Sequence, residues 1–138
     1  MDYEKSCGAA VYRRAECGLL VLVEWMRKGH VSIPKGHVEG KETERETALR
    51  EIREETGLRV TIDEGFRRVV RYSPKEGVIK DVVFFAAEYA GGEIRVQPEE
   101  VTMAKFLPLS EAMEAVTYDT DRDTLRALGA YLEQRGIS

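Results

Sequence analysis

The sequence predicts an α+β domain in which helices pack on the faces of a mixed β-sheet. Short runs of β-branched and aromatic residues dominate the middle of the chain, and segments with helical periodicity interrupt and follow them. The chain has 138 residues, of which 43% are hydrophobic and 33% are charged, a balance typical of a globular protein. We therefore expect residues 1–138 to form one domain.

The first part of the chain is predicted to contain two strands and a loop. Residues 7–14 and 19–25 have strand character, and the second run is almost continuously apolar, as in a strand that is buried on both faces. Residues 26–42 are rich in glycine and contain Pro34, so we expect a loop there, with a short extended piece near Ser32.

A helix should follow this loop. Thr43 and Glu46 have the spacing of a capping box, and Gly57 is placed to end the helix. The apolar positions of the helix recur at helical spacing and are Ala48, Leu49, Ile52 and Thr56. Beyond it, strands are predicted over residues 59–62, 66–72, 81–88 and 103–107, with turns near residues 74–77 and 91–92. Residues 110–116 and 120–134 are predicted to form two closing helices.

Composition argues against several classes of protein. No run of about 18 apolar residues is present, so we expect no membrane span. The first residues lack the basic start and apolar stretch of a secretory signal. A formal net charge of -4 argues against a stable nucleic-acid partner. Cys7 and Cys17 match no metal-ligand spacing, so we expect reduced thiols in a cytoplasmic protein.

The predicted helix carries a row of carboxylates beside its apolar face. At about 100° per residue, Glu54 lies about 60° to one side of Glu51, and Glu55 lies about 40° to the other side, toward the apolar positions. Like charges at such spacings destabilise a helix by about 0.2–0.5 kcal/mol per pair, and a bound cation removes that cost. Mg²⁺ suits the set because it takes oxygen ligands and retains water. A second interpretation is a solvated helix with surface ion pairs Glu46–Arg50 and Arg50–Glu54.

The residues around this helix match a known motif. Residues 36–58 resemble the Nudix box, Gly-x5-Glu-x7-Arg-Glu-U-x-Glu-Glu-x-Gly-U, in which U is aliphatic. Every specified position is matched, by Gly36, Glu42, Arg50, Glu51, Ile52, Glu54, Glu55, Gly57 and Leu58. The resemblance implies an α/β/α sandwich and metal-dependent hydrolysis of a phosphoanhydride bond in a nucleotide-type substrate.

The resemblance also assigns roles to residues of the box. It implies that the carbonyl of Gly36 and the side chains of Glu51, Glu54 and Glu55 hold Mg²⁺, or Mn²⁺ in its place. It implies that Arg50 and Glu42 position the loop and helix through an ion pair. We expect Glu54 to act as the base toward water, with Glu51 and Glu55 as the main ligands. A further family ligand from a later loop corresponds to Glu100, with Glu99 as the neighbouring alternative. The other interpretation is that both are exposed loop acids.

Other segments resemble the asymmetric diadenosine tetraphosphate hydrolase branch of the family. These are residues 34–40, residues 7–14, and Tyr72 with the later Lys80. The resemblance implies that Tyr72 and Lys80 contact the phosphate chain. The alternatives are a partly buried strand tyrosine and a solvated lysine at the end of a strand.

The same branch implies further substrate contacts. His30 and His37 flank the entry to the box, and a protonated histidine there could stabilise a leaving oxyanion. The alternative is that either histidine is an ordinary loop residue. Lys35 lies next to Gly36, and Tyr118 occupies the place of an aromatic that stacks on adenine, with core packing as its alternative. The chain departs from the branch before Pro34, where residues 31–33 lack the expected aromatic.

Three functions are compatible with these features. The first is hydrolysis of diadenosine tetraphosphate to ATP and AMP. The second is a mononucleotide pyrophosphatase or an RNA 5'-end pyrophosphohydrolase, of which the acidic charge disfavours the RNA version. The third is a nucleotide-sensing module that binds without cutting, although no box carboxylate is missing. In each case the expected partner is a small nucleotide.

Overall fold

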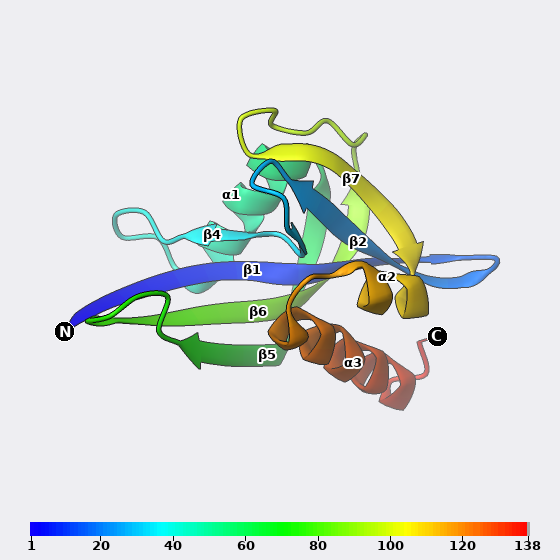
Figure 1. Cartoon of the computed structure of the whole chain (residues 1–138). Coiled ribbons are helices and arrows are strands. Elements are labelled where there is room, and N and C mark those ends of the chain that lie inside the picture. The colour runs from blue at the N-terminus through cyan, green and yellow to red at the C-terminus, as the bar shows by residue number, and fades with distance from the viewer. Residues whose placement is uncertain (138) are drawn as a thin grey trace.

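The computed structural model describes residues 1–137 and contains a mixed β-sheet with helices on both of its faces (Figure 1). The elements in chain order are β1 (Asp2–Ala15), β2 (Gly18–Met26), β3 (Val31–Ser32), β4 (Lys35–His37), α1 (Glu44–Thr56), β5 (Arg59–Tyr72), β6 (Val78–Gly91), β7 (Val101–Pro108), α2 (Leu109–Ala115) and α3 (Asp119–Gln134). Within the described residues, none of the helices is both long and apolar enough to span a bilayer.

The sheet splits between β1 and β2. The strand order is β3-β2-β1-β6-β5, with β1 and β6 parallel and the other pairs antiparallel. Strand β1 pairs with β2 only over residues 12–15, whereas residues 6–8 of β1 pair with β4. Gly8 permits this second pairing, because a Cβ there would overlap Pro34 and Lys35. The short strand β4 therefore lies along the split.

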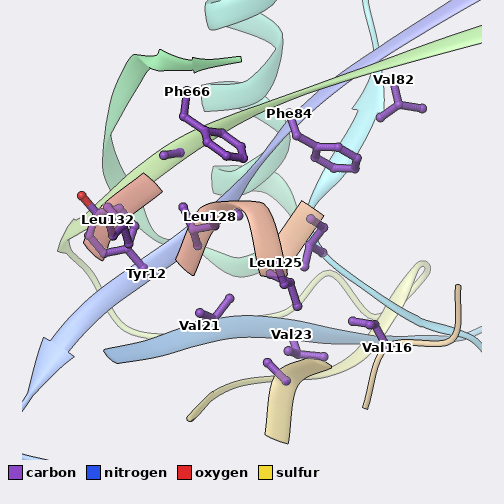
Figure 2. Close-up of a cluster of buried hydrophobic side chains, with 14 residues drawn as sticks. Tyr12, Val21, Val23, Phe66, Val82, Phe84, Val116, Leu125, Leu128 and Leu132 are labelled. Carbon is purple, nitrogen blue, oxygen red and sulfur yellow. The ribbon is translucent and has the colours of Figure 1, made fainter. Parts of the chain in front are cut away.

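Alternation along the strands divides the core into two halves. One half packs against α2 and α3, and Figure 2 shows Leu125 and Leu128 of α3 pointing into it together with Phe84 of β6. The other half packs against α1 through Ala48 and Ile52. Neighbouring strand residues belong to opposite halves of the core. Val21, Val23 and Phe84 lie in the half that packs on α2 and α3, whereas Leu22 and Phe85 lie in the half that packs on α1. The prediction that the second strand is buried on both faces is confirmed.

The predicted elements are present, with differences at their ends. Residues 59–62 and 66–72 belong to one strand, β5, whose pairing with β6 shifts register between Asp63 and Arg67. Strands β1 and β6 begin earlier than predicted, because they pair with each other from Asp2 and Val78 onward. The extended piece near Ser32 is β3, but β4 was not predicted, because its three residues include a glycine and follow a proline.

The caps of α1 form as predicted. The Thr43 hydroxyl accepts a hydrogen bond from the Glu46 amide at 3.1 Å, and the Glu46 carboxylate accepts one from the Thr43 amide at 2.9 Å. Gly57 ends the helix with φ 77°, in the left-handed region that favours glycine. These contacts fix where α1 begins and ends, and therefore which side chains face the sheet.

Thr43→Ala removes the cap and should lower the free energy of unfolding by about 1 kcal/mol, within about 0.5–2. Thr43→Ser keeps the hydroxyl and is the matched control, with a much smaller effect. Urea unfolding followed by circular dichroism measures both variants. Equal stability of the alanine and serine variants would show that the capping box contributes nothing.

Candidate active site

The carboxylates of α1 are buried in a graded series. Glu55 is a buried residue with 2% exposure, whereas the Glu51 and Glu54 side chains are 13% and 44% exposed. This order follows the predicted helical positions, because Glu55 is nearest to the apolar face and Glu54 is farthest from it. The interpretation of α1 as a merely solvated helix is wrong, since two of the three carboxylates lie in or beside the core.

The backbone of β4 packs against Glu51. A Cβ atom built on Gly36 would overlap the Glu51 carboxyl group, so only glycine leaves this carboxyl in place. Gly36 pairs with Cys7 of β1, and this pairing holds β4 in its position next to α1. The first glycine of the box therefore lies in contact with a box glutamate.

Arg50 ties the loop before α1 to the helix. Its Nε donates to Glu42 Oε2 at 2.6 Å, and its Nη2 donates to Glu42 Oε1 at 3.0 Å and to the His37 carbonyl at 2.9 Å. The predicted ion pair between Arg50 and Glu42 is thus formed with fork geometry. The hydrogen bonds from Arg50 lower the pKa of Glu42 to about 2.

The third guanidinium nitrogen of Arg50, Nη1, binds carboxylates of α1. Nη1 donates to Glu51 Oε1 at 2.7 Å and to Glu54 Oε1 at 2.9 Å, and it lies 3.1 Å from Glu39 Oε2. The guanidinium therefore offsets part of the repulsion among these acids and orients them. Of the two surface pairs considered for Arg50, the one with Glu54 forms, while Glu46 caps the helix instead.

A second buried acid, Glu24, faces Glu55. Glu24 lies on β2 with 1% exposure, and its carboxyl group contacts that of Glu55. Burial, followed by the charge of Glu24, raises the pKa of Glu55, and burial raises the pKa of Glu24. Sequence reasoning missed Glu24, although a lone acid in an apolar strand and at even spacing from Leu22 is a signal that could have found it.

Glu100 lies near this pair, in the loop before β7. Glu100 is exposed. Burial is the main cause that raises the pKa values of Glu24 and Glu55, and the negative charge of Glu100 makes a smaller contribution in the same direction. The backbone carbonyl of Glu100 accepts a hydrogen bond from the Arg27 amide at 2.8 Å, which anchors the loop. These effects favour Glu100 over Glu99 as the acid that approaches the box.

The oxygen atoms of these acidic groups are the type of ligand that a hard divalent cation binds. Glu55 Oε1 is buried and has no hydrogen-bond partner, which is rare for a buried carboxylate and leaves it free to bind an ion. All the donors are oxygens, as Mg²⁺ and Mn²⁺ require. Among residues 1–137 no three His, Cys, Asp or Glu side chains already surround one ion position, and Arg50 binds oxygens of Glu51 and Glu54.

A cavity of about 600 Å³ opens on the α3 side of the sheet. Its lining combines apolar residues, basic and aromatic side chains, and the two aspartates Asp119 and Asp121. The lining residues named by the sequence analysis are His30, Lys35, Tyr72, Lys80 and Tyr118. The fold thus brings together residues that are distant in the sequence. His37 is not part of the lining; it is exposed on β4, and its carbonyl accepts from Arg50.

The two tyrosines of the cavity are exposed. Tyr118 is 54% exposed and Tyr72 is 42% exposed, so the interpretation of Tyr118 as core packing is wrong. The ring of Tyr118 lies 5.8 Å from that of His30, measured between centroids. Both tyrosines line the cavity over Val70, Val82 and Phe84, which makes a surface suited to a flat ring.

The charged groups of the cavity are partly withdrawn from water. Burial, followed by the charge of Lys35, lowers the pKa of Lys80 and that of His30. Both shifts oppose the positive charge of these groups, whereas a bound polyphosphate would favour it. Asp121, in the first turn of α3, also lines the cavity with 4% exposure, and burial raises its pKa. Sequence reasoning missed it, because an aspartate in a first helical turn is ordinary.

Lys35 connects the cavity to the acidic row. Successive residues of a strand point to opposite faces. On β4, Lys35 lines the cavity, whereas Gly36 touches Glu51. The charge of Lys35 also acts on Glu24, where it opposes the effect of burial on the pKa. A polyanion in the cavity would therefore contact Lys35, and the next residue, Gly36, contacts the carboxylate of Glu51.

Known proteins are similar to this chain over most of its length. The NUDIX domain family model matches residues 3–128. The asymmetrical bis(5'-nucleosyl)-tetraphosphatase of Mus musculus is 32% identical over 134 residues, covering 88% of this chain and 90% of that protein. The 8-oxo-(d)GTP phosphatase of Mycolicibacterium smegmatis is 38% identical over 95 residues, covering 69% of this chain but 29% of that protein. A binary complex of C. elegans Ap4A hydrolase has a TM-score of 0.85 at 26% identity, covering 95% of this chain and 98% of that one.

The Arg50–Glu42 pair should make stability depend on acid pH. The pKa of Glu42 is 4.5 ordinarily and about 2 in the folded protein, so its contribution is present above pH 4.5 and is lost as pH falls toward 2. Between these limits wild type should lose more stability than Glu42→Gln. Urea unfolding at a series of pH values measures this, and parallel profiles for the two proteins would contradict the assignment.

Proposed function

The chain belongs to the Nudix hydrolase family, and we propose that its substrate is a dinucleoside tetraphosphate, with diadenosine tetraphosphate cleaved to ATP and AMP. The observation that carries this proposal is the cavity lined by Tyr72, Lys80, Tyr118 and Lys35, because Lys35 precedes Gly36, which contacts Glu51 of the carboxylate row. The similarity to the mouse tetraphosphatase and to the C. elegans Ap4A hydrolase, each over most of both chains, supports it.

The cavity supports one assignment of substrate contacts. The exposed ring of Tyr118 would stack on a nucleobase over the apolar residues of the lining. Lys80 and Lys35 would bind the phosphate chain, and the Tyr72 hydroxyl would donate a hydrogen bond to it. His30 would donate a hydrogen bond to a phosphate or leaving oxygen. His37, outside the cavity lining, would reach only a part of the substrate that extends beyond it.

Nudix hydrolases generally need divalent metal ions. In this chain the ligands would be the Gly36 carbonyl and the carboxylates of Glu51, Glu54, Glu55 and Glu100, and we propose Mg²⁺ as the ion, with Mn²⁺ able to replace it. When bound, the ion would neutralise phosphate charge, orient the substrate and lower the pKa of bound water. The buried and unpaired Oε1 of Glu55 supports this donor set.

The chain's own residues would position water and move its proton. Glu54 is the most exposed acid of the row, so it can reach water and accept a proton as the water oxygen attacks phosphorus. The P–O bond of the phosphoanhydride breaks in the same step, and the bridging oxygen leaves with the displaced phosphate or nucleotide group. Arg50 holds Glu54 from one side and Glu42 from the other, so the base stays fixed relative to the loop. Most of the rate enhancement would come from positioning the water and the substrate and from neutralising the charge of the phosphates.

A mononucleotide pyrophosphatase is the second candidate. The 8-oxo-(d)GTP phosphatase of M. smegmatis is more similar in sequence over the shared segment, although the chain spans under a third of that protein. One stacking tyrosine and two lysines would also serve a nucleoside triphosphate. The net charge of -4 makes an RNA 5' end a weaker substrate. A non-catalytic role is disfavoured, because every box carboxylate is present.

A comparison of kcat/KM for different substrates distinguishes these candidates. Purified protein with Mg²⁺ is given diadenosine tetraphosphate, dGTP or 8-oxo-dGTP, and the products are separated by chromatography. We expect the highest kcat/KM for the dinucleotide, with ATP and AMP as products and with loss of turnover in chelator. Equal or better turnover of a triphosphate would overturn the substrate assignment but not the hydrolase chemistry.

Glu54→Gln tests the role of the base. The change removes the proton acceptor but keeps the shape of the side chain, so kcat should fall by about 10²–10⁴-fold with a modest change in substrate affinity. Glu114→Gln on the exposed surface of α2 is the control and should retain full turnover. Unchanged turnover of Glu54→Gln would contradict the assignment of the base.

A further inference from the structure

Glu24 is a charged residue in an otherwise apolar part of β2. The residues before it, Val21, Leu22 and Val23, are fully buried core residues, and Glu24 is 1% exposed. Neither of its carboxylate oxygens has a hydrogen-bond partner. A buried carboxylate without any hydrogen-bond donor destabilises a folded protein, so its presence requires a compensating group.

The register of β2 directs Glu24 toward α1. Leu22 belongs to the half of the core that packs on α1, and Glu24 is the next residue of β2 on that face. There its carboxyl group contacts that of Glu55, which is also buried and whose Oε1 is unpartnered. Two acidic groups from different elements thus face each other with three buried oxygens unpaired.

Neighbouring basic groups do not neutralise this pair. Lys35 acts on Glu24 through its charge, but no ion pair within 4.0 Å joins Glu24 or Glu55 to a basic side chain of residues 1–137. Arg50 is engaged with other acids, Glu42, Glu51 and Glu54. What can compensate the pair is either a shared proton or a cation, and a cation would satisfy more of the unpaired oxygens.

We propose that Glu24 supplies a carboxylate oxygen to the divalent ion held by the α1 glutamates. The inference rests on the proposed function, because it requires that the box binds such an ion. It adds a ligand from β2, outside the box, so the ion joins the strand to the helix across the split in the sheet. Binding of the ion should therefore stabilise the fold as well as prepare the site.

Two variants separate this role from others. Glu24→Gln keeps the shape but removes the negative charge, and Glu24→Leu removes both the charge and the ligand atom. Glu88→Gln, a strand glutamate whose side chain is 45% exposed, is the control. Mn²⁺ is the probe, because its affinity and the number of waters bound to it can both be measured by electron paramagnetic resonance without substrate.

We expect both Glu24 variants to bind Mn²⁺ about 10–100-fold more weakly than wild type. A tenfold loss equals about 1.4 kcal/mol. The Mn²⁺ bound to Glu24→Leu should carry one more water than the Mn²⁺ bound to wild type. In chelator both variants should melt at or above the wild-type temperature, because the facing carboxylates are gone. In Mn²⁺ their upward shift in melting temperature should be smaller than that of wild type.

Other outcomes overturn the proposal. Unchanged Mn²⁺ affinity in Glu24→Gln would mean that the pair shares a proton and that Glu24 is not a ligand. Weaker binding with an unchanged water count in Glu24→Leu would mean that Glu24 only positions Glu55. If wild type bound no Mn²⁺, the metal dependence in the proposed function would fail as well, whereas failure of the Glu24 variants alone leaves that function intact.

Discussion

The backbone of β4 packs directly on the carboxyl group of Glu51, and the rest of the site depends on this contact. Gly36 allows the approach, because any side chain there would displace the carboxylate. Arg50 then holds the loop and the helix in one position by binding Glu42 and the His37 carbonyl. The acids of α1 are therefore fixed at the edge of the core, and like charges stay close together at a cost that a cation would relieve.

The split in the sheet connects two chemically different surfaces. On the α1 face, carboxylates gather around Glu51 and Glu55, while on the α3 face a cavity is lined by tyrosines and lysines. Strand β4 lies along the split and contributes to both, through Gly36 on one face and Lys35 on the other. In the proposed function, the base of a nucleotide would occupy the cavity and its phosphates would extend toward the acids.

The sequence predicted the features that local patterns control. The caps of α1 and the graded burial of its acids follow from helical geometry, which residues within the helix determine. It did not predict β4, because the pairing of this strand depends on Gly8 of β1, a distant residue. It missed Asp121, because an aspartate in a first helical turn gives no sign of burial, and it missed that Glu24, a lone acid in a strand predicted to be buried, faces Glu55 of another element. Tertiary packing, rather than local preference, decides such positions.

The central claim is that the acids of α1 form a divalent-cation site at the contact with β4. Anomalous diffraction from crystals grown with Mn²⁺ tests it most directly. The claim predicts an anomalous peak within coordination distance of Glu51 and Glu55, next to the carbonyl of Gly36. A crystal at saturating Mn²⁺ without a peak at that position, or with Arg50 still bound to Glu51 and Glu54 and the ion elsewhere, would contradict it.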